Sequence, residues 1–242
     1  MFSYMKLKKL LNAIFAFLAI VVISACTINN DSAKSEEKDS ESVNSTSSST
    51  DSTKTDKKSS TYSAETNTLT DHRDNQVYKT VTIGLQVWMA QNLNYETDDS
   101  YCYNDDTANC EKYGRLYKWE SALRACPGGW HLPTKMDFET LFEAVGGEGI
   151  AGTKLKSSSG WGENLYGESG DGSDDFGFSA LPVGFKSIKG PCYKQGQTAH
   201  FWSSTEIDAD IVYNIYLNSK FKSGTMDTIH KLMAISVRCL KD

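Results

Sequence analysis

"CPGGWHLPTKMDFETL", residues 126–141, carries the clearest structural signals of the chain. Thr134 is a natural helix N-cap, and Asp137 three positions later makes a variant of the capping box with aspartate in place of glutamate. Apolar residues then recur at the spacing of an amphipathic helix until two glycines interrupt them: Phe138, Leu141, Phe142, Val145, then Gly146 and Gly147. The pattern predicts a helix over residues 134–145.

The residues before this helix are interpreted as a scaffold rather than as a reactive cluster. The glycine pair at 128–129 turns the chain, and Trp130 and Leu132 are expected to pack into the core. Pro133 ends the extended stretch just before the cap. His131 is therefore predicted to be structural, either hydrogen-bonded to the backbone or facing solvent.

Outward from this stretch, the signals indicate one more helix and several strands. "RLYKWESALRA" (115–125) has the apolar stripe of a helix, and "QVYKTVTIGLQVWMA" (76–90) alternates like a hairpin that turns near Gly84. Residues 157–175 form a long polar loop. Further short strands are expected in "FGFSALPVGF", "HFWSS", "IVYNIYL" and "MAISVRCL". Two helices early and strands late predict an α+β domain over residues 71–242.

The N-terminus has the pattern of an exported lipoprotein. Three lysines precede an apolar run from Leu10 to Ile23, which is too short for a stable membrane span and typical of a signal peptide over residues 1–25. The run ends on "ISAC", which resembles a bacterial lipobox and implies that Cys26 is acylated and becomes the mature N-terminus. Thr27 is not the aspartate that retains some lipoproteins at the inner membrane, so the outer membrane is expected by analogy.

The next segment, 26–70, is predicted to be a disordered tether. Nearly half of its residues are Ser or Thr and very few are large and apolar, so it cannot bury enough surface to offset the entropy of ordering. The whole chain has a formal net charge of −6. An acidic chain argues against nucleic acid as a partner, since that needs a basic face, and leaves glycans, proteins and cations as candidate ligands.

Five further cysteines are expected to form two disulfides and one leftover thiol in an oxidising compartment. Cys102 and Cys110 flank a polar loop short enough to close on itself. A bond between Cys126 and Cys239 would close a loop of more than 100 residues, worth about 4.7 kcal/mol in the chain-entropy model. Cys192 would then be a free or intermolecular thiol. The alternative pairing, Cys192 with Cys239, stays open at this point.

Seven motifs occur in order across residues 83–239: "IGLQVWMAQNLNY", "GRLYKWESAL", "CPGGWHLPT", "AGTKLKSSSGW", "DDFGFSALPVGF", "FWSSTE" and "SVRC". Together they resemble the Fibrobacter succinogenes major paralogous domain family. The resemblance implies a C-type-lectin-like fold, with two helices packed on a twisted, mainly antiparallel sheet and a long loop region. It also implies a disulfide from an early helix to the final strand, which favours Cys126–Cys239. It supplies no activity and no catalytic residues.

No catalytic group is identifiable from the sequence. "GEGIAG" (147–152) matches the glycine spacing of a dinucleotide-binding motif, but it follows a helix instead of a strand and is interpreted as a turn. The four histidines share no helical spacing, and no G-x-S-x-G elbow is present. An enzyme is therefore unsupported.

Within "GESGDGSDDFGF", Asp171, Asp174 and Asp175 offer the oxygen ligands that calcium requires. Lectin-like folds often hold calcium in such loops, although a solvated acidic turn is the simpler alternative. Trp161 and Tyr166 are candidate platforms for stacking sugar rings, with the alternative that Trp161 only plugs the loop. Three aromatic residues are instead assigned to the core: Phe176, Phe178 and Trp202.

These observations favour a lipid-anchored binding module that engages a glycan or protein through loop 157–175. One alternative is an envelope-organising protein whose partner is another envelope component, reached through Cys192. A less favoured alternative is an exported enzyme on the same fold.

Overall fold

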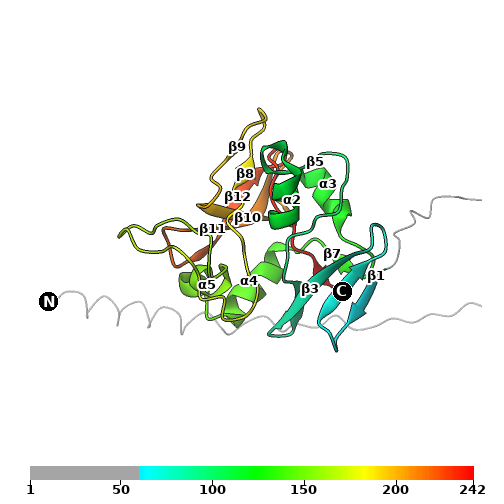
Figure 1. Cartoon of the computed structure of the whole chain (residues 1–242), viewed down its shortest axis with the longest axis horizontal. Coiled ribbons are helices and arrows are strands. Elements are labelled where there is room, and N and C mark those ends of the chain that lie inside the picture. Colours follow the sequence, from blue (N-terminus) through cyan, green and yellow to red (C-terminus); the bar gives the residue numbers. More distant parts are fainter. Residues whose placement is uncertain (1–59) are drawn as a thin grey trace, which may run out of the picture. The chain divides into compact units, whose positions relative to one another are not determined.

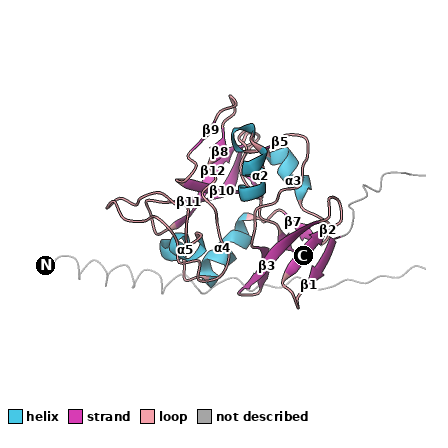
Figure 2. Cartoon of the chain, viewed as in Figure 1, coloured by secondary structure: helices cyan, strands magenta, loops and turns pink. Residues whose placement is uncertain are grey.

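The computed structural model of the protein describes residues 60–242. This part has an α+β fold with four α-helices and several antiparallel sheets, which confirms the predicted fold class (Figures 1 and 2). The helices are α2 (Thr107–Tyr113), α3 (Trp119–Ala125), α4 (Lys135–Ala144) and α5 (Glu148–Leu155), with a 3-10 turn η1 (Tyr103–Asp105) before α2. The strands are β1 (Ser60–Ser63), β2 (Thr68–Asp71), β3 (Gln76–Ile83), β4 (Gln86–Met89), β5 (Ser100–Tyr101), β6 (Leu116–Tyr117), β7 (Trp130–His131), β8 (Phe185–Lys186), β9 (Cys192–Tyr193), β10 (Thr198–Glu206), β11 (Ile211–Asn218), β12 (Gly224–His230) and β13 (Leu240–Lys241).

The largest sheet joins the start and the end of the described chain. Its order is β1-β2-β3-β4-β13-β7, and each adjacent pair runs antiparallel. The C-terminal strand β13 therefore lies between β4 and β7, with Leu240 opposite both Trp88 and His131. A second sheet has the order β10-β11-β12. This arrangement is compatible with the C-type-lectin-like fold that the family resemblance implies.

The opening motif folds as predicted. Thr134 accepts from Asp137 N at 3.2 Å, and the Asp137 carboxylate accepts from Thr134 N at 2.8 Å, so both halves of the capping box are present at the start of α4. Trp130 and Leu132 are buried. The His131 side chain partly faces solvent, and its Nδ1 lies 2.7 Å from the Asp242 carboxylate and not against backbone. The motif therefore joins α4 to the chain terminus.

Two apolar clusters fill the space between the sheets and the helices. One contains Trp130 and Trp202 and lies beside α3. The other is built from aromatic rings, with Trp88 stacked on Phe138 at 5.3 Å and edge-on to Phe178 at 5.8 Å between ring centres. These contacts hold α4 against the sheet that contains β4. Burial of Trp202 and Phe178 was expected from the sequence, and Phe176 is half-buried beside the second cluster.

Several sequence-based boundaries are wrong. The helix expected over 115–125 begins only at Trp119, because Leu116–Tyr117 pair with β5 as β6. "GEGIAG" is not a turn; it lies in the first turns of α5, since Gly147 is the N-cap residue of that helix. The region between Cys102 and Cys110 is not a plain loop, since η1 and the start of α2 lie within it. The protein thus has four α-helices in its described part rather than two.

The strand predictions are partly right. The hairpin that turns at Gly84 is present as β3 and β4, and "HFWSS" and "IVYNIYL" form β10 and β11. "FGFSALPVGF" is mostly irregular, and only its last residue lies in β8. "MAISVRCL" contributes only Leu240 to a strand, and β12 was not anticipated. Backbone amides in these irregular segments are instead paired across the core, as when Leu93 N donates to Val237 O at 3.0 Å.

The predicted tether reaches too far into the folded part. Strand β1 pairs with β2, and β2 pairs with β3, so residues 60–70, which the sequence assigns to the tether, belong to the main sheet. The sequence did not predict these strands because most of their residues are polar, and in β2 only alternate residues, such as Leu69, face the core. The predicted signal peptide (1–25), the predicted acylation of Cys26 and the predicted tether up to residue 59 lie outside the described residues. Within residues 60–242, no helix combines the length and the apolar character that crossing a bilayer requires.

Candidate functional site

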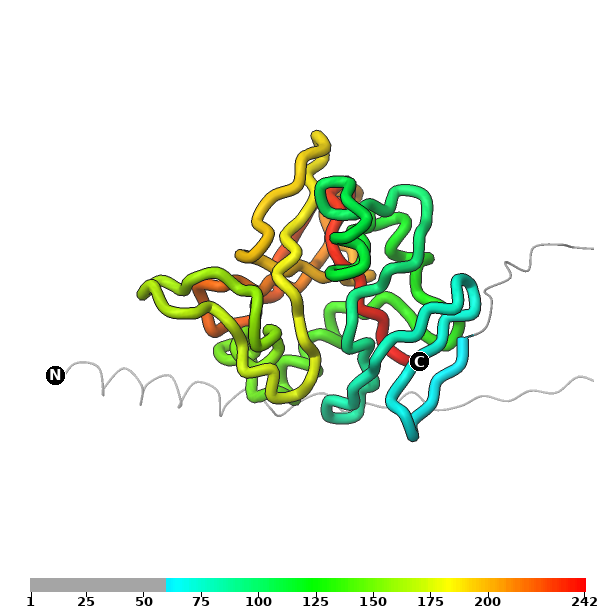
Figure 3. The backbone as a smooth tube through the Cα atoms, viewed as in Figure 1, coloured from blue at the N-terminus to red at the C-terminus, as the bar shows by residue number. Residues whose placement is uncertain are grey.

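The loop 157–175 is held in place by a buried lysine. Lys156 is 3% exposed, and its Nζ donates to the carbonyl oxygens of Gly170 at 2.6 Å, Asn218 at 3.2 Å and Phe221 at 3.4 Å. The three carbonyls belong to the loop, to the end of β11 and to the β11–β12 turn. The ammonium therefore ties two segments that lie about 50 residues apart in sequence and next to each other in space (Figure 3).

Only glycine fits at the point where the loop meets that turn. A Cβ at Gly170 would lie 2.2 Å from Gly162 O and 2.6 Å from Ser219 O, both well inside van der Waals contact. Burial lowers the pKa of Lys156 to about 8, with the negative charge of Asp171 opposing the shift. At neutral pH the amine is therefore mainly an ammonium, which is the form that donates to all three carbonyls.

Trp161 is not a sugar platform. Its side chain is 6% exposed, and Nε1 donates to Ser157 Oγ at 3.1 Å and to Ala180 O at 3.2 Å. The Lys156 ammonium lies over its ring, 5.1 Å from the centre. The alternative reading of Trp161 as a plug that fills the loop is the correct one, because a ring that is covered on its face by a lysine and bonded at its edge offers no free surface.

The three aspartates do not converge on one point. Asp171 accepts from Trp161 N at 2.9 Å and Ser169 Oγ at 2.6 Å. Asp174 accepts from the backbone and hydroxyl of Ser179, and Asp175 pairs with Lys154. No group of three or more His, Cys, Asp or Glu side chains with metal-binding geometry occurs among residues 60–242. The predicted calcium site at Asp171, Asp174 and Asp175 is therefore not formed, and each carboxylate instead fastens its own part of the loop.

Tyr166 does meet the expectation of an exposed aromatic. It is 87% exposed, and it lines a cleft of about 600 Å³ between loop 157–175 and the β11–β12 turn. Phe221, 49% exposed, comes from the turn on the other side, flanked by Lys220 and Lys222. We call this the loop cleft; it is lined by Thr153, Lys156, Asn164, Leu165, Tyr166, Glu168, Ser169, Gly170, Asp171 and Ser219–Lys222. The run "KFK" (220–222) was missed; an aromatic between two lysines in a short interstrand segment was the available signal.

Hydrogen bonds to the Asn164 side chain form the turn that carries the exposed Tyr166. The Asn164 side-chain oxygen accepts from Tyr166 N at 2.8 Å and from Glu168 N at 3.1 Å, so it closes a tight turn around the tyrosine. Lys156 and Gly170 also line the cleft, so polar groups lie near the exposed ring. The ring can stack on one face of a ligand while these polar groups hydrogen-bond to its edge.

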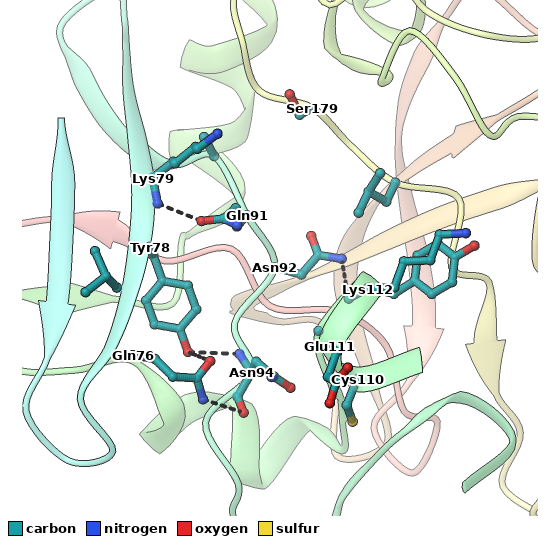
Figure 4. A pocket seen from close by; sticks show the side chains of 15 residues that line it. Gln76, Tyr78, Lys79, Gln91, Asn92, Asn94, Cys110, Glu111, Lys112 and Ser179 are labelled. Carbon is teal, nitrogen blue, oxygen red and sulfur yellow. Dashed lines mark hydrogen bonds between the residues drawn. The ribbon is translucent and has the colours of Figure 1, made fainter. Parts of the chain in front are cut away.

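A second depression lies on another part of the domain, between the hairpin β3–β4 with the segment after it and helix α2 (Figure 4). It has a volume of about 290 Å³ and adjoins a further cavity of about 350 Å³, with which it shares Gln76, Asn94, Cys110 and Glu111. We call the two together the amide groove. The side-chain amides of Gln76, Gln91, Asn92 and Asn94 line it, and sequence analysis did not single out any of them.

Comparison with known proteins identifies the domain but not a ligand. A family model described as the Fibrobacter succinogenes major domain matches residues 81–241. The chain belongs to this family. No curated protein and no solved structure matches the chain significantly.

The Fibrobacter succinogenes major domain, as matched, begins within β3, yet the ordered fold begins earlier. β1 and β2 precede the match and extend its main sheet by two strands. Most of the loop cleft and of the amide groove is built from residues inside the matched range, although Gln76 to Lys79 of the groove are contributed by the part of β3 before it.

The cysteines of the domain pair in the favoured arrangement. The disulfides are Cys102–Cys110, which ties η1 to α2, and Cys126–Cys239, which ties the end of α3 to the last segment of the chain. Cys192 in β9 is a free, half-buried thiol whose sulfur accepts a hydrogen bond from Asn104 N at 3.2 Å. The alternative Cys192–Cys239 pairing is excluded.

Proposed function

We propose that this protein is a cell-envelope lipoprotein, anchored through acyl chains on Cys26 at the outer membrane, whose major domain binds a glycan in the loop cleft. The observation that carries the proposal is the pair of exposed rings, Tyr166 and Phe221, on either side of an open cleft of about 600 Å³. Ligand pockets combine aromatic side chains with a small number of polar groups that fix the orientation of the ligand, as this cleft does.

The charge around the cleft favours a ligand that is not strongly cationic. Lys220 and Lys222 stand beside Phe221, while Glu168 and Asp171 lie on the loop side. Donors and acceptors of both kinds suit hydroxyl groups, which can serve as either. A sugar ring stacked on Tyr166 would place its hydroxyls near these polar side chains of the loop cleft.

The binding test is a glycan array probed with the full chain. The chain should be purified in a polyoxyethylene detergent, because maltoside and glucoside detergents themselves present sugar rings. We expect a set of bound glycans, and affinity for them about tenfold lower in Tyr166→Ala, since the stacked face is lost. Tyr193→Ala removes another exposed tyrosine, 48% exposed and outside the cleft, and should bind like the parent.

Two results would count against the glycan. Selective binding to an array of envelope proteins, lost in Tyr166→Ala, would make the ligand a protein. No binding on either array, or binding that Tyr166→Ala and Phe221→Ala leave unchanged, contradicts the cleft as the ligand site.

The anchor is tested separately. Mass spectrometry of the mature protein should show an acylated cysteine at position 26 as the first residue, and Cys26→Ser should release the chain from the membrane fraction. A mature protein without acyl chains would contradict the anchor while leaving the cleft untouched. Separation of inner and outer membranes then checks the location.

Free Cys192 supports a second candidate function, that of an envelope-organising protein joined to another component by a disulfide. A non-reducing gel of intact cells should then show an adduct that disappears in Cys192→Ser. A monomer in every lane removes this candidate.

A further inference from the structure

We propose that the amide groove is a second ligand site, distinct from the loop cleft, and that it binds a neutral saccharide. The inference does not rest on the proposed function of the cleft, because the groove uses a different face and different residues. Three observations support it: hydrogen bonds that fix the walls of the groove, the unpaired side-chain oxygen of Asn94, and further side-chain donors and acceptors that line the groove.

One wall of the groove is pre-organised by a chain of hydrogen bonds (Figure 4). The Tyr78 hydroxyl accepts from Asn94 N at 3.1 Å and donates to Gln76 Oε1 at 3.3 Å. Gln76 Nε2 then donates to Asp74 Oδ2 at 2.7 Å and to Asn94 O at 3.4 Å. Burial raises the pKa of Tyr78, so its hydroxyl keeps its proton. The hydroxyl therefore remains the donor to Gln76 in this series of hydrogen bonds.

The facing wall is α2, and it is fixed as firmly. The Cys102–Cys110 disulfide ties the middle of the helix to the residue before η1. At the C-terminal end of the helix, Asn92 Nδ2 donates to Tyr113 O at 2.8 Å, and Arg115 N donates to Leu93 O at 3.0 Å. Both walls are therefore set before a ligand arrives, which keeps the entropic cost of binding low.

Asn94 lines both cavities, and its side chain makes no hydrogen bond to another residue of the described part of the chain. Its backbone is bonded on both sides, yet Oδ1 is buried without a hydrogen-bond partner, and no residue among 60–242 bonds to its amide nitrogen. An unsatisfied buried oxygen destabilises the folded state. Because the terminal torsion of asparagine is soft, the amide can turn in the groove and exchange this unpaired state for two bonds to a ligand.

The other available groups define the ligand class. Glu111 is an exposed acceptor with no partner in the described part of the chain, and Lys79, Lys112 and the Gln91 amide are available donors. Charges of both signs disfavour a strongly charged ligand, and the side-chain amides of the groove suit neutral polar groups. Adjacent hydroxyls of a sugar each donate and accept, and so match an amide beside a carboxylate.

The test is hydrogen exchange of the full chain, in a polyoxyethylene detergent, with and without maltose, lactose or chitobiose. At least one disaccharide should protect amides in residues 76–79, 90–94 and 110–113 while leaving loop 157–175 unchanged. Asn94→Leu should weaken this protection about tenfold, measured as the concentration for half-protection, without lowering the melting temperature, because it deletes an unsatisfied oxygen. A purely structural asparagine would instead lower that temperature.

Two further variants test whether saccharide binding depends on a carboxylate of the groove or on any exposed carboxylate. Glu111→Gln should weaken the same binding several-fold, and Glu143→Gln, an exposed glutamate on α4, should not. Tyr166→Ala should leave groove binding intact. The proposal is overturned if no disaccharide protects the groove, if protection survives both Asn94→Leu and Glu111→Gln, or if a mixture of short peptides protects it and the sugars do not.

Discussion

The Nζ atom of Lys156 lies 2.6 Å from the carbonyl oxygen of Gly170, and the same ammonium donates to two more carbonyls from the β11–β12 segment. Three backbone oxygens around one positive charge is an arrangement that also suits a bound cation. The loop that the sequence assigned to calcium is thus ordered by a cation belonging to the chain itself.

The first prediction concerns this ammonium. Lys156→Met keeps the length of the side chain but leaves three carbonyls without their donor, and we expect a loss of about 1–3 kcal/mol in the free energy of unfolding. Hydrogen exchange should accelerate in loop 157–175 and around residues 218–222, and less elsewhere. Lys154→Met removes only an exposed partner of Asp175 and should change stability by no more than about 0.5 kcal/mol. Uniform acceleration across the domain would contradict a local role.

The second prediction is a pH dependence with a defined sign. Burial holds the pKa of Lys156 at about 8 in the folded state, below its ordinary value of 10.5. The unfolded chain therefore binds this proton more tightly, and its contribution makes the free energy of unfolding rise with pH between about 8 and 10.5. Lys156→Met lacks this contribution, so the stability of the parent relative to the variant should increase across that window. A constant or shrinking difference in urea titrations from pH 7.5 to 10 would disprove it.

The sequence could predict the parts of this fold whose signals are local. The capping residues Thr134 and Asp137 predicted the start of α4, and the alternation of apolar and polar residues around Gly84 predicted the β3–β4 hairpin. What it could not predict depends on distant partners. Leu116 fits the apolar stripe of a helix, but it pairs with Tyr101 and therefore lies in strand β6. The sequence of β1 has no strand pattern of its own, and β1 forms by pairing with β2. Lys156 and Phe221 are ordinary residues in the sequence, and only the folded chain brings them to one cleft.

Calcium supplies the third prediction. Asp171 and Asp174 already accept hydrogen bonds from backbone amides, and Asp175 pairs with Lys154. A cation would have to break these bonds and would meet the Lys156 charge nearby. We therefore expect the melting temperature and loop hydrogen exchange to be the same in 5 mM calcium, at least about 500-fold above the dissociation constant of a sensor-type site, and in excess chelator. A rise of several degrees with calcium would restore the metal site.

The fourth prediction concerns the fully buried Arg238. Its guanidinium donates to Asn92 Oδ1 at 2.7 Å, Met89 O at 3.1 Å and Ser179 O at 2.9 Å, and also to the carbonyl of Phe178. Burial lowers the pKa of Arg238 to about 9. Arg238→Met leaves these acceptors unpaired inside the core and should cost about 3–5 kcal/mol. Arg124→Met, on an exposed pair with Glu120, is the control and should be nearly neutral by urea unfolding. Equal effects in both variants would contradict the role of Arg238.

The fifth prediction compares the two disulfides. Cys126–Cys239 spans 113 residues and Cys102–Cys110 spans 8, so the chain-entropy model assigns them about 5 and about 2.5 kcal/mol. The double variant Cys126→Ala/Cys239→Ala should therefore unfold at markedly lower urea than Cys102→Ala/Cys110→Ala. The second variant should act instead on the amide groove, because it removes the covalent tie between Cys110 in α2 and the residue before η1, and should weaken saccharide protection there while sparing the loop cleft. The reverse order of stabilities would mean that strain or residual structure, and not loop closure, decides what each bond contributes.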